Sequence, residues 1–201
     1  MNKPPCSDMD KSAWRERLRA RRRALSESER NTAAQDCANY LRNSTAWRSS
    51  EHIAVYLPND GEMPTEAVVK AARDENKSLY LPVVCKNTLR FAPWSAGDTL
   101  PRNRFGIGEP RTPPVDLSRL QLVLLPLVGW TRAGRRLGMG GGFYDRVFAG
   151  SVAQSTLRIG VAYECQCEDR FGEAGLWDPL WDSWDVPLHA LVSEAGVYSF
   201  G

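Results

Sequence analysis

Apolar runs typical of strands alternate along the chain with amphipathic segments typical of helices. Buried strands are predicted at residues 52–57, 79–84, 122–128, 157–162 and 188–192, and a short edge strand at 89–94. Helices are predicted at residues 8–25, 26–42 and 64–76 and from Phe143 onward, and residues 95–114 are expected to form a long loop. Strands that alternate with helices indicate an α/β fold. We therefore expect residues 1–201 to form a single layered domain, whose central, largely parallel sheet is flanked by helices.

Two segments carry strong local signals. Residues 26–29 read Ser-Glu-Ser-Glu, which is the capping box of a helix start. Residues 122–128 are the most apolar of the predicted strands, as is typical of a strand buried on both faces of a parallel sheet.

The overall composition excludes several classes of protein. The 201 residues are 42% hydrophobic and 25% charged, with a net charge of +2. This balance excludes a wholly disordered chain, a collagen-like repeat and a strongly basic nucleic-acid binder. The longest apolar stretch, residues 122–130, is too short to span a bilayer, and the first residues lack the apolar region of a secretion signal. We therefore expect a soluble, cytoplasmic protein that binds neither membranes nor nucleic acid.

Cysteine and histidine usage narrows the chemistry further. The five cysteines are odd in number and lack CxxC spacing, which indicates neither a disulfide framework nor a zinc site. Cys165 and Cys167 are expected to face the same way on a strand, as small packing residues rather than a redox pair. His52 and His189 are the two histidines, so a Ser-His-Asp triad has little to draw on. The chemistry is expected to depend on carboxylates, cations and backbone amides.

Charge is spread unevenly along the chain. Residues 11–30 hold eight cations and three acids, whereas residues 163–201 hold eight acids and one arginine. Of the 26 cations, 21 are arginines, whose planar fork suits phosphate and carboxylate. This pattern is consistent with an anionic ligand on one side and a cation such as Mg²⁺ on the other, or with two solvated faces of opposite sign.

A glycine-rich loop follows the most apolar strand and leads into a predicted helix, with four glycines between residues 138 and 142. In open α/β sheets this is where ligands bind, and such glycines let backbone N–H groups approach a phosphate. Arg135, Arg136 and Arg146 flank the loop, and Asp145 can hold a Mg²⁺ that bridges phosphate oxygens. The loop matches neither a Walker A motif nor GxGxxG. We favour phosphate binding over a purely structural turn.

Residues 136–146, RLGMGGGFYDR, resemble the signature of the 5-formyltetrahydrofolate cyclo-ligase (methenyltetrahydrofolate synthetase) family. Other family-like motifs occur in the expected order over most of the chain. They are Lys11-x-x-x-Arg15, Tyr56-Leu57-Pro58 with Gly61-Glu62 and Thr65, Phe91-x-x-Trp94, Gly106-Ile107 with Glu109-Pro110, Leu125-Pro126-Leu127-Val128, Ala162-Tyr163 with Gln166, and Trp184-Asp185-Val186-Pro187-Leu188.

The resemblance implies an ATP- and Mg²⁺-dependent enzyme that acts on small molecules. Members of this family cyclise 5-formyltetrahydrofolate to 5,10-methenyltetrahydrofolate and release ADP and phosphate. ATP is needed because a formamide oxygen is a poor leaving group. Once that oxygen is phosphorylated, N10 can attack and phosphate can depart. Such an enzyme positions two substrates and neutralises phosphoryl charge, and it needs no nucleophilic side chain.

The resemblance also implies roles for individual residues. The ATP-binding residues would be Lys11, Arg15, Arg136, Leu137, Gly138, Met139, Gly140, Gly141, Gly142, Phe143 and Tyr144. Of these, Met139, Gly140, Gly141, Gly142 and Phe143 would also border the folate, together with Leu57 and Glu62. Asp145 and Asp185 would ligate Mg²⁺, and Arg136 and Asp145 would be catalytic. Lys11 and Arg15 are four residues apart and so share one helix face, although spacing alone also fits a solvated basic face.

Other residues near these motifs have less defined roles. Tyr163 and Gln166 follow a predicted strand, close enough to reach the site. The glycine loop has Met139 and Gly141 where family members often carry a basic residue, which places charge compensation on the flanking cations. Three tryptophans form a stripe at helical spacing: Trp177, Trp181 and Trp184. We expect this stripe to pack within the protein rather than to form a platform for a pterin ring. A polyglutamate tail or solvent would meet the arginines of the long loop: Arg102, Arg104 and Arg111.

Two other functions remain open from the residues alone. A sugar-phosphate isomerase on a related sheet would need only the phosphate loop, and it would neither hydrolyse ATP nor require Asp145 and Asp185 together. A non-catalytic nucleotide- or RNA-binding module would use the basic N-terminal helix, but the chain lacks RNP, KH and zinc-knuckle patterns. The cyclo-ligase interpretation accounts for more of the motifs than either.

Overall fold

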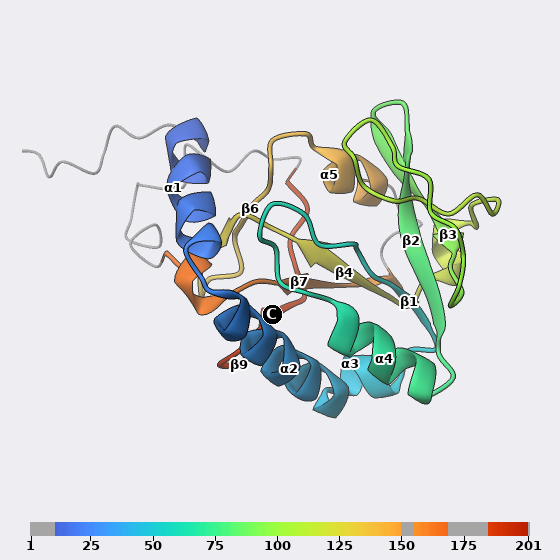
Figure 1. Cartoon of the computed structure of the whole chain (residues 1–201), viewed down its shortest axis with the longest axis horizontal. Coiled ribbons are helices and arrows are strands. Elements are labelled where there is room, and N and C mark those ends of the chain that lie inside the picture. Colours follow the sequence, from blue (N-terminus) through green and yellow to red (C-terminus); the bar gives the residue numbers. More distant parts are fainter. Residues whose placement is uncertain (1–10, 150–154, 169–184, 201) are drawn as a thin grey trace, which may run out of the picture.

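The computed structural model describes residues 11–149, 155–168 and 185–200. Within them, a seven-stranded sheet has the order β3-β2-β1-β4-β7-β8-β9 (Figure 1). The five inner strands run parallel, and the edge strands β3 and β9 pair antiparallel with their neighbours. The strands are β1 His52–Ala54, β2 Ser78–Cys85, β3 Thr88–Pro93, β4 Leu122–Pro126, β7 Leu157–Val161, β8 Ala190–Ser193 and β9 Gly196–Ser199. The predicted α/β fold with a largely parallel sheet is confirmed.

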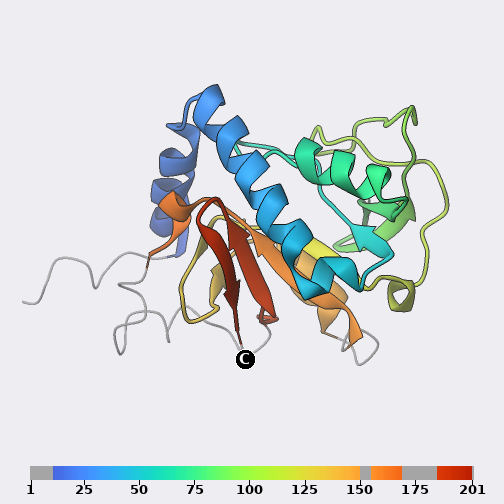
Figure 2. The same ribbon diagram turned by 90° about the horizontal axis from the view of Figure 1, so that it is seen from below.

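Helices cover the sheet, and a small hairpin carries the glycine loop. The helices are α1 Lys11–Arg23, α2 Glu27–Asn43, α3 Thr45–Arg48, α4 Glu66–Asp74 and α5 Phe143–Phe148, with 3-10 turns η1 Leu117–Arg119 and η3 Glu164–Gln166. Strands β5 Gly129–Trp130 and β6 Arg136–Leu137 form the hairpin. Seen from below, α2 crosses one face of the sheet obliquely, with α4 beside it (Figure 2). No helix of the described residues is long and apolar enough to cross a membrane.

The predicted capping box starts α2. The Ser26 hydroxyl accepts a hydrogen bond from Glu29 N at 3.2 Å, and the Glu29 carboxylate accepts one from Ser26 N at 2.8 Å. Two otherwise unsatisfied N–H groups of the helix start are thereby bonded, as the sequence predicts.

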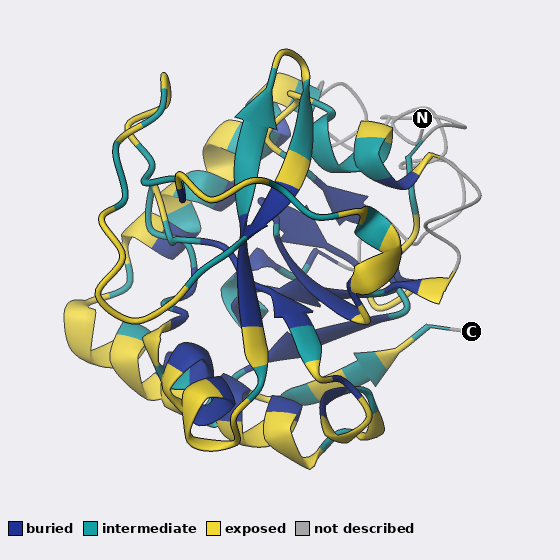
Figure 3. Ribbon diagram, turned by 90° about the vertical axis from the view of Figure 1, so that its right-hand side faces the viewer, coloured by how far each residue is buried: buried dark blue, intermediate teal, exposed yellow. Residues whose placement is uncertain are grey.

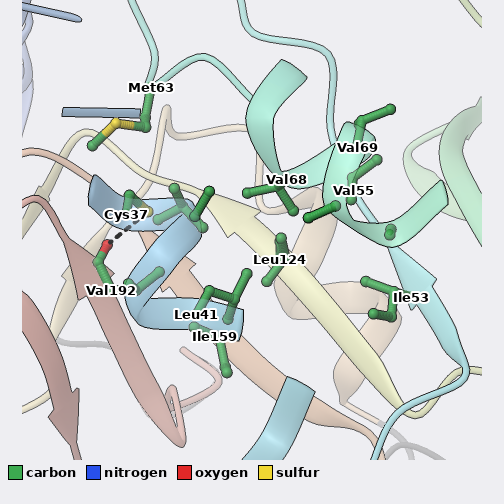
Figure 4. Close-up of a cluster of buried hydrophobic side chains, with 14 of the residues drawn as sticks. Cys37, Leu41, Ile53, Val55, Met63, Val68, Val69, Leu124, Ile159 and Val192 are labelled. Atoms are coloured by element: carbon green, nitrogen blue, oxygen red, sulfur yellow. Dashed lines mark hydrogen bonds between the residues drawn. The ribbon is translucent and has the colours of Figure 1, made fainter. Parts of the chain in front are cut away.

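Strand β4 is buried on both faces because helices or loops cover each side of the sheet. Its side chains alternate: Leu122 and Leu124 join one apolar core, and Val123 and Leu125 join the other. Figure 4 shows part of the first core, where Leu124 lies near residues of α2 and α4. In Figure 3 the strands at the centre of the sheet are mostly dark blue and the second half of β2 is teal, while the outward faces of the helices are largely yellow. The prediction that this run forms a doubly buried strand is confirmed.

Several predicted boundaries were wrong. Strand β1 ends at Ala54 rather than residue 57, because the chain turns back on itself there: the Tyr56 hydroxyl donates to Met63 O at 2.9 Å. Strand β8 is not the last strand, because β9 follows it after a two-residue turn. Helix α3, the β5–β6 hairpin and η1 were not predicted. The N-terminal helix was predicted from residue 8, and residues 8–10 lie outside the described residues.

The two cysteines predicted on a strand are elsewhere. Cys165 lies in the 3-10 turn η3 and Cys167 directly follows it. Burial together with the Glu194 charge raises the pKa of the Cys165 thiol to about 11. That thiol is a packing group at neutral pH, consistent with the rejection of a redox pair.

Helix α1 is held to the rest of the fold by a carboxylate that binds three arginines. Asp60 Oδ2 accepts from Arg19 Nε at 2.6 Å and from Arg22 Nη2 at 3.0 Å, and Oδ1 accepts from Arg23. Arg22 is fully buried and also donates to Asp60 O at 2.9 Å and Leu127 O at 3.1 Å. Burial alone would raise the pKa of Asp60, but the hydrogen bonds from Arg19, Arg23 and Arg22 lower it to about 2.

Asp60→Asn is expected to destabilise the fold in a pH-dependent way. Because the folded pKa of Asp60 lies below its ordinary value of 3.8, its ionisation contributes about 2–3 kcal/mol to the free energy of unfolding above pH ~4. That contribution disappears as the pH falls towards 2. Urea unfolding of both proteins at pH 7, 5, 4 and 3 should show a difference that shrinks with acidity. A difference that stays constant over this range would contradict the assignment.

Asp74→Asn is the matched control. Asp74 is an exposed α4 carboxylate that pairs with Lys70 four residues away, so its loss should change the free energy of unfolding by less than about 0.5 kcal/mol.

Candidate functional site

The main cleft lies at the carboxyl ends of β1 and β4 and has a volume of about 830 Å³. These strands are neighbours in the sheet, but the chain leaves them in opposite directions: β1 leads to β2 on one side and β4 to β7 on the other. A crevice of this kind, where the strand order reverses, is the usual ligand site of an open α/β sheet. The fold therefore places the candidate site where the sequence argument expected it.

Every site residue inferred from the sequence lines this cleft. They are Lys11, Arg15, Leu57, Glu62, Arg136, Leu137, Gly138, Met139, Gly140, Gly141, Gly142, Phe143, Tyr144, Asp145 and Asp185. Four separate segments of the chain contribute them: residues 11–15, 57–62, 136–145 and 185. Their shared position is observed, whereas their individual roles remain proposals.

Helix α1 lies against the glycine loop. Arg15 Nε donates to Gly138 O at 2.8 Å, and a Cβ on Gly140 would come within 3.2 Å of the Arg15 guanidinium carbon. Gly140 has a φ of +93°, a backbone conformation that favours glycine. Lys11 lies one turn before Arg15 on the same helix and also lines the cleft. The loop thus presents backbone and two cations to the same space.

Helix α5, which follows the loop, has only six residues and begins after Gly142. Its dipole is weak, because few peptide units are aligned. Charge compensation for an anion in this cleft therefore falls mainly on the cationic side chains that line it: Lys11, Arg15, Arg136 and Arg146.

Arg136 and Asp145 form a pair at the wall of the cleft. Arg136 is 7% exposed, and its Nη2 donates to Asp145 Oδ1. Asp145 Oδ1 also accepts from Val186 N at 3.1 Å, and Arg136 Nε donates to Val186 O at 3.3 Å. Asp185 precedes Val186, so these bonds hold the backbone next to Asp185 against Asp145, and both carboxylates line the cleft.

The donor set suits a hard cation that is shared with a ligand. The described residues contain no group of three or more His, Cys, Asp or Glu that could hold a metal ion alone. Mg²⁺ is commonly held by one or two carboxylates together with phosphate oxygens and water. Asp145 and Asp185 fit this requirement, with the remaining ligands supplied by a bound phosphate chain.

Glu62 also lines the cleft, from the turn after β1. Glu62 N donates to Asn59 O, and Asn59 N donates to Glu62 Oε2, both at 3.0 Å. Burial raises the pKa of Glu62 to about 7, although the Arg22 charge and the Asn59 hydrogen bond lower it. Burial, and then the Glu62 charge, raise the pKa of Tyr144, which lines the same cleft. The cleft thus holds a carboxylate whose pKa lies near neutrality.

The long loop contributes residues to which no role was assigned from the sequence. Phe105 and Met139 are about half exposed at the cleft, and the Phe105 ring meets Phe143 edge to face at 5.8 Å. Glu109 anchors the loop, since its Oε1 accepts from Val84 N and Asn103 Nδ2, both at 2.8 Å. The Gly-Pro-Arg composition predicted a loop correctly, but no local pattern indicates that it folds over the site.

Other residues singled out from the sequence lie away from the cleft. Gln166 is buried and donates to Leu127 O and Val128 O, and the Tyr163 hydroxyl donates to Glu62 O at 3.4 Å. These two residues support the backbone of the site. Arg135 belongs to the turn of the β5–β6 hairpin rather than to the lining of the cleft. The three-tryptophan stripe lies outside the described residues: Trp177, Trp181 and Trp184.

The arginines of the long loop do not line the cleft either: Arg102, Arg104 and Arg111. Two of them bond to nearby backbone. Arg102 donates to Gly106 O, and Arg104 donates to Lys86 O, both at 2.7 Å. These contacts tie the loop together and leave the suggested polyglutamate contact untested.

Comparison with known proteins agrees with this geometry. The family model described as 5-formyltetrahydrofolate cyclo-ligase family matches residues 7–193. The 5-formyltetrahydrofolate cyclo-ligase of Haemophilus influenzae is 33% identical over 184 residues, covering 89% of this chain and 94% of its own. That of Escherichia coli K12 is 32% identical over 189 residues, covering 91% of this chain and all of its own.

Solved structures are similar over nearly the whole chain. The NMR structure of Aquifex aeolicus 5,10-methenyltetrahydrofolate synthetase superposes with a TM-score of 0.79 at 28% identity, covering 95% of this chain and 93% of that one. The Mycoplasma pneumoniae synthetase gives a TM-score of 0.72 at 25% identity, covering 92% and 99%. The motifs, the cleft and these similarities agree: this chain is an enzyme of the 5-formyltetrahydrofolate cyclo-ligase family.

Proposed function

We propose that this enzyme uses MgATP to cyclise 5-formyltetrahydrofolate to 5,10-methenyltetrahydrofolate, releasing ADP and phosphate. The observation that carries the proposal is one cleft with two chemically different kinds of lining. Cations, glycine backbone and the carboxylates of Asp145 and Asp185 line it together with apolar side chains and Glu62. A phosphate chain and a pterin ring require these two environments.

The reaction needs the substrates to be placed rather than attacked by the protein. The formyl oxygen takes the γ-phosphoryl group as the bond to the ADP oxygen breaks. N10 then bonds to the formyl carbon, the N10 proton passes to the phosphate group, and the carbon–oxygen bond breaks as phosphate leaves. Lys11 and Arg15 hold the phosphate chain. Asp145 and Asp185 hold Mg²⁺, which neutralises phosphoryl charge when bound. Arg136 is catalytic through its contact with Asp145, whose carboxylate it orients.

Glu62 and the apolar side chains of the cleft have separate roles in folate binding. An ionised carboxylate accepts hydrogen bonds from the N–H donors of a pterin ring. Leu57, Met139 and Phe143 supply apolar area against the ring system, and Phe105 extends this area at the cleft mouth. The long loop thereby limits access of water to the activated intermediate.

The alternative functions find no support in the geometry. The RNA-binding interpretation depended on a free basic helix, yet Arg19, Arg22 and Arg23 all contact Asp60. A sugar phosphate would not fill the apolar part of the cleft, which Leu57, Met139 and Phe143 line. We propose further that the protein is cytoplasmic, binds small molecules rather than nucleic acid or membranes, and forms one such domain over residues 1–201.

Arg15→Ala is expected to weaken MgATP binding by about tenfold or more, because it removes a cation and the bond to the glycine loop. Isothermal titration with a non-hydrolysable ATP analogue and Mg²⁺ measures the effect. Arg17→Ala is the matched control, since Arg17 is exposed on the same helix and contacts the Trp14 ring. Equal nucleotide affinity of the Arg15 variant and wild type would exclude this role.

Asp145→Asn is expected to lower turnover by about 100-fold while changing the free energy of unfolding by no more than about 1 kcal/mol. Asparagine keeps the Oδ1 acceptor for Arg136 and Val186 but lacks the charge that Mg²⁺ requires. Absorbance of the methenyl product, followed over a range of Mg²⁺ concentrations, gives the rate and the metal dependence. An unchanged rate with the same Mg²⁺ dependence would refute the metal assignment.

Glu62→Gln is expected to raise the KM for folate and leave nucleotide affinity unchanged. The ionised fraction of Glu62 falls as the pH drops below its pKa of about 7, so wild-type kcat/KM for folate should decline on the acid side of neutrality. The variant should lack this decline, because an amide does not titrate. Loss of ATP binding, or a wild-type acid limb in the variant, would show that Glu62 is misplaced.

A further inference from the structure

Arg22 lies on the same helix as Lys11 and Arg15 but is buried beneath the site rather than at the cleft. Its side chain is completely buried, and it is not among the residues that line the cleft. Three of its hydrogen bonds go to the segments that follow β1 and β4: Asp60 O, Asp60 Oδ2 and Leu127 O. A buried guanidinium is costly unless all of its donors find partners in this way.

The same guanidinium also faces the carboxylate of Glu62. Arg22 Nη2 lies 4.0 Å from Glu62 Oε1, and the Glu62 side chain is only 13% exposed. The other carboxylate oxygen, Oε2, is bonded to Asn59 N. One carboxylate oxygen of Glu62 thus accepts a backbone hydrogen bond, the other lies within ion-pair distance of a buried cation, and the residue lines the cleft.

The charged and titratable groups around Glu62 come from every element packed against it. They are Arg22 from α1, Glu27 and Arg30 from α2, Asp60 from the same turn, Tyr56 after β1, Tyr144 from α5 and Tyr163 after β7. Burial raises the pKa of all three tyrosines, which therefore stay neutral near pH 7, and Asp60 stays ionised. Of these groups, Arg22 is the cation that opposes the neutralisation of Glu62 by burial.

We propose that Arg22 is a positioning residue for the folate substrate: it holds the Glu62 carboxylate ionised and oriented into the cleft, where it accepts hydrogen bonds from the pterin. This inference rests on the proposed function. Arg22 thus contributes to folate binding, although Lys11 and Arg15 on the same helix are proposed to bind the nucleotide. Arginine is required because a lysine ammonium does not present a rigid fork to three acceptors at once.

The first test measures Glu62 itself, without substrate. Carbon-13 NMR titration of the Glu62 carboxyl, identified by its absence in Glu62→Gln, gives the midpoint in wild type, Arg22→Lys and Arg22→Gln. An opposite charge at this distance is worth about one pH unit or more, so Arg22→Gln should raise the midpoint by that amount. Arg22→Lys should raise it less, because it keeps a cation but not the fork. If Arg22→Gln does not fold, Arg22→Lys carries the test.

The second test measures folate use. Below the midpoints, the KM for 5-formyltetrahydrofolate should rise about tenfold in Arg22→Gln, which is the fold-change that one pH unit implies. The acid limb of kcat/KM should move to higher pH, with MgATP affinity unchanged. Introducing Arg22→Lys into Glu62→Gln should not shift the pH profile further.

Arg23→Gln is the matched control, because Arg23 is 51% exposed and contacts Asp60 Oδ1 without facing Glu62. It should leave the Glu62 midpoint unchanged. Folded Arg22 variants that lose thermal stability but keep the wild-type midpoint and acid limb would overturn the proposal, since Arg22 would then be purely structural. A shifted midpoint in a protein whose wild type neither binds nor cyclises 5-formyltetrahydrofolate would overturn the proposed function, while the Arg22–Glu62 coupling stands.

Discussion

The buried Arg22 guanidinium is the constraint on which the site depends. Its acceptors lie in the segments that follow β1 and β4. These strands are neighbours in the sheet, and the chain leaves them in opposite directions at the cleft. Because an unpaired buried cation costs several kcal/mol, α1 is stable only where all of these acceptors can be reached. That single docking position also puts Arg15 against Gly138 and Lys11 at the cleft. One buried charge therefore positions both the cations of α1 and the turn that carries Glu62.

The basic N-terminal segment is consequently less of an anion-binding surface than its charge suggests. Arg19, Arg22 and Arg23 converge on Asp60, and Arg21 pairs with Glu168 at 2.9 Å. The last of these contacts joins the basic start of the chain to its acidic C-terminal segment, residues 163–201. The charge asymmetry of the sequence thus serves internal pairing to a large extent, and Lys11 and Arg15 are the cations of α1 that line the cleft.

Two backbone contacts of Val186 organise the part of the cleft that holds the carboxylates. Arg136 of β6 donates to Val186 O, and Val186 N donates to Asp145 of α5. Asp185 directly precedes Val186, and all three side chains line the cleft. The Arg136 charge lowers the cost of holding a carboxylate in a half-buried wall, and the second carboxylate would add the charge that the proposed Mg²⁺ needs. Hydrogen bonds within the protein hold this part of the cleft in place, as a reaction based on placement requires.

Local features of this protein follow from the sequence alone. The capping box of α2, the doubly buried β4, the glycine loop and the shared face of Lys11 and Arg15 each depend on residues within a few positions of one another. Backbone hydrogen bonding and side-chain periodicity encode such features directly. The family resemblance added the remaining site residues, and all of them meet in one cleft.

Tertiary structure alone decided which distant groups share an environment. Helical spacing puts Arg22 on the same face as Trp14 and Leu18, but it does not show what a buried guanidinium there would bind. Its partners depend on where Asp60 and Leu127 lie in the folded protein. The closure of Phe105 onto Phe143 and the pairing of β9 with β8 likewise depend on contacts beyond any local window. Periodicity shows which face of an element is apolar, whereas strand order determines what that face and its charges meet.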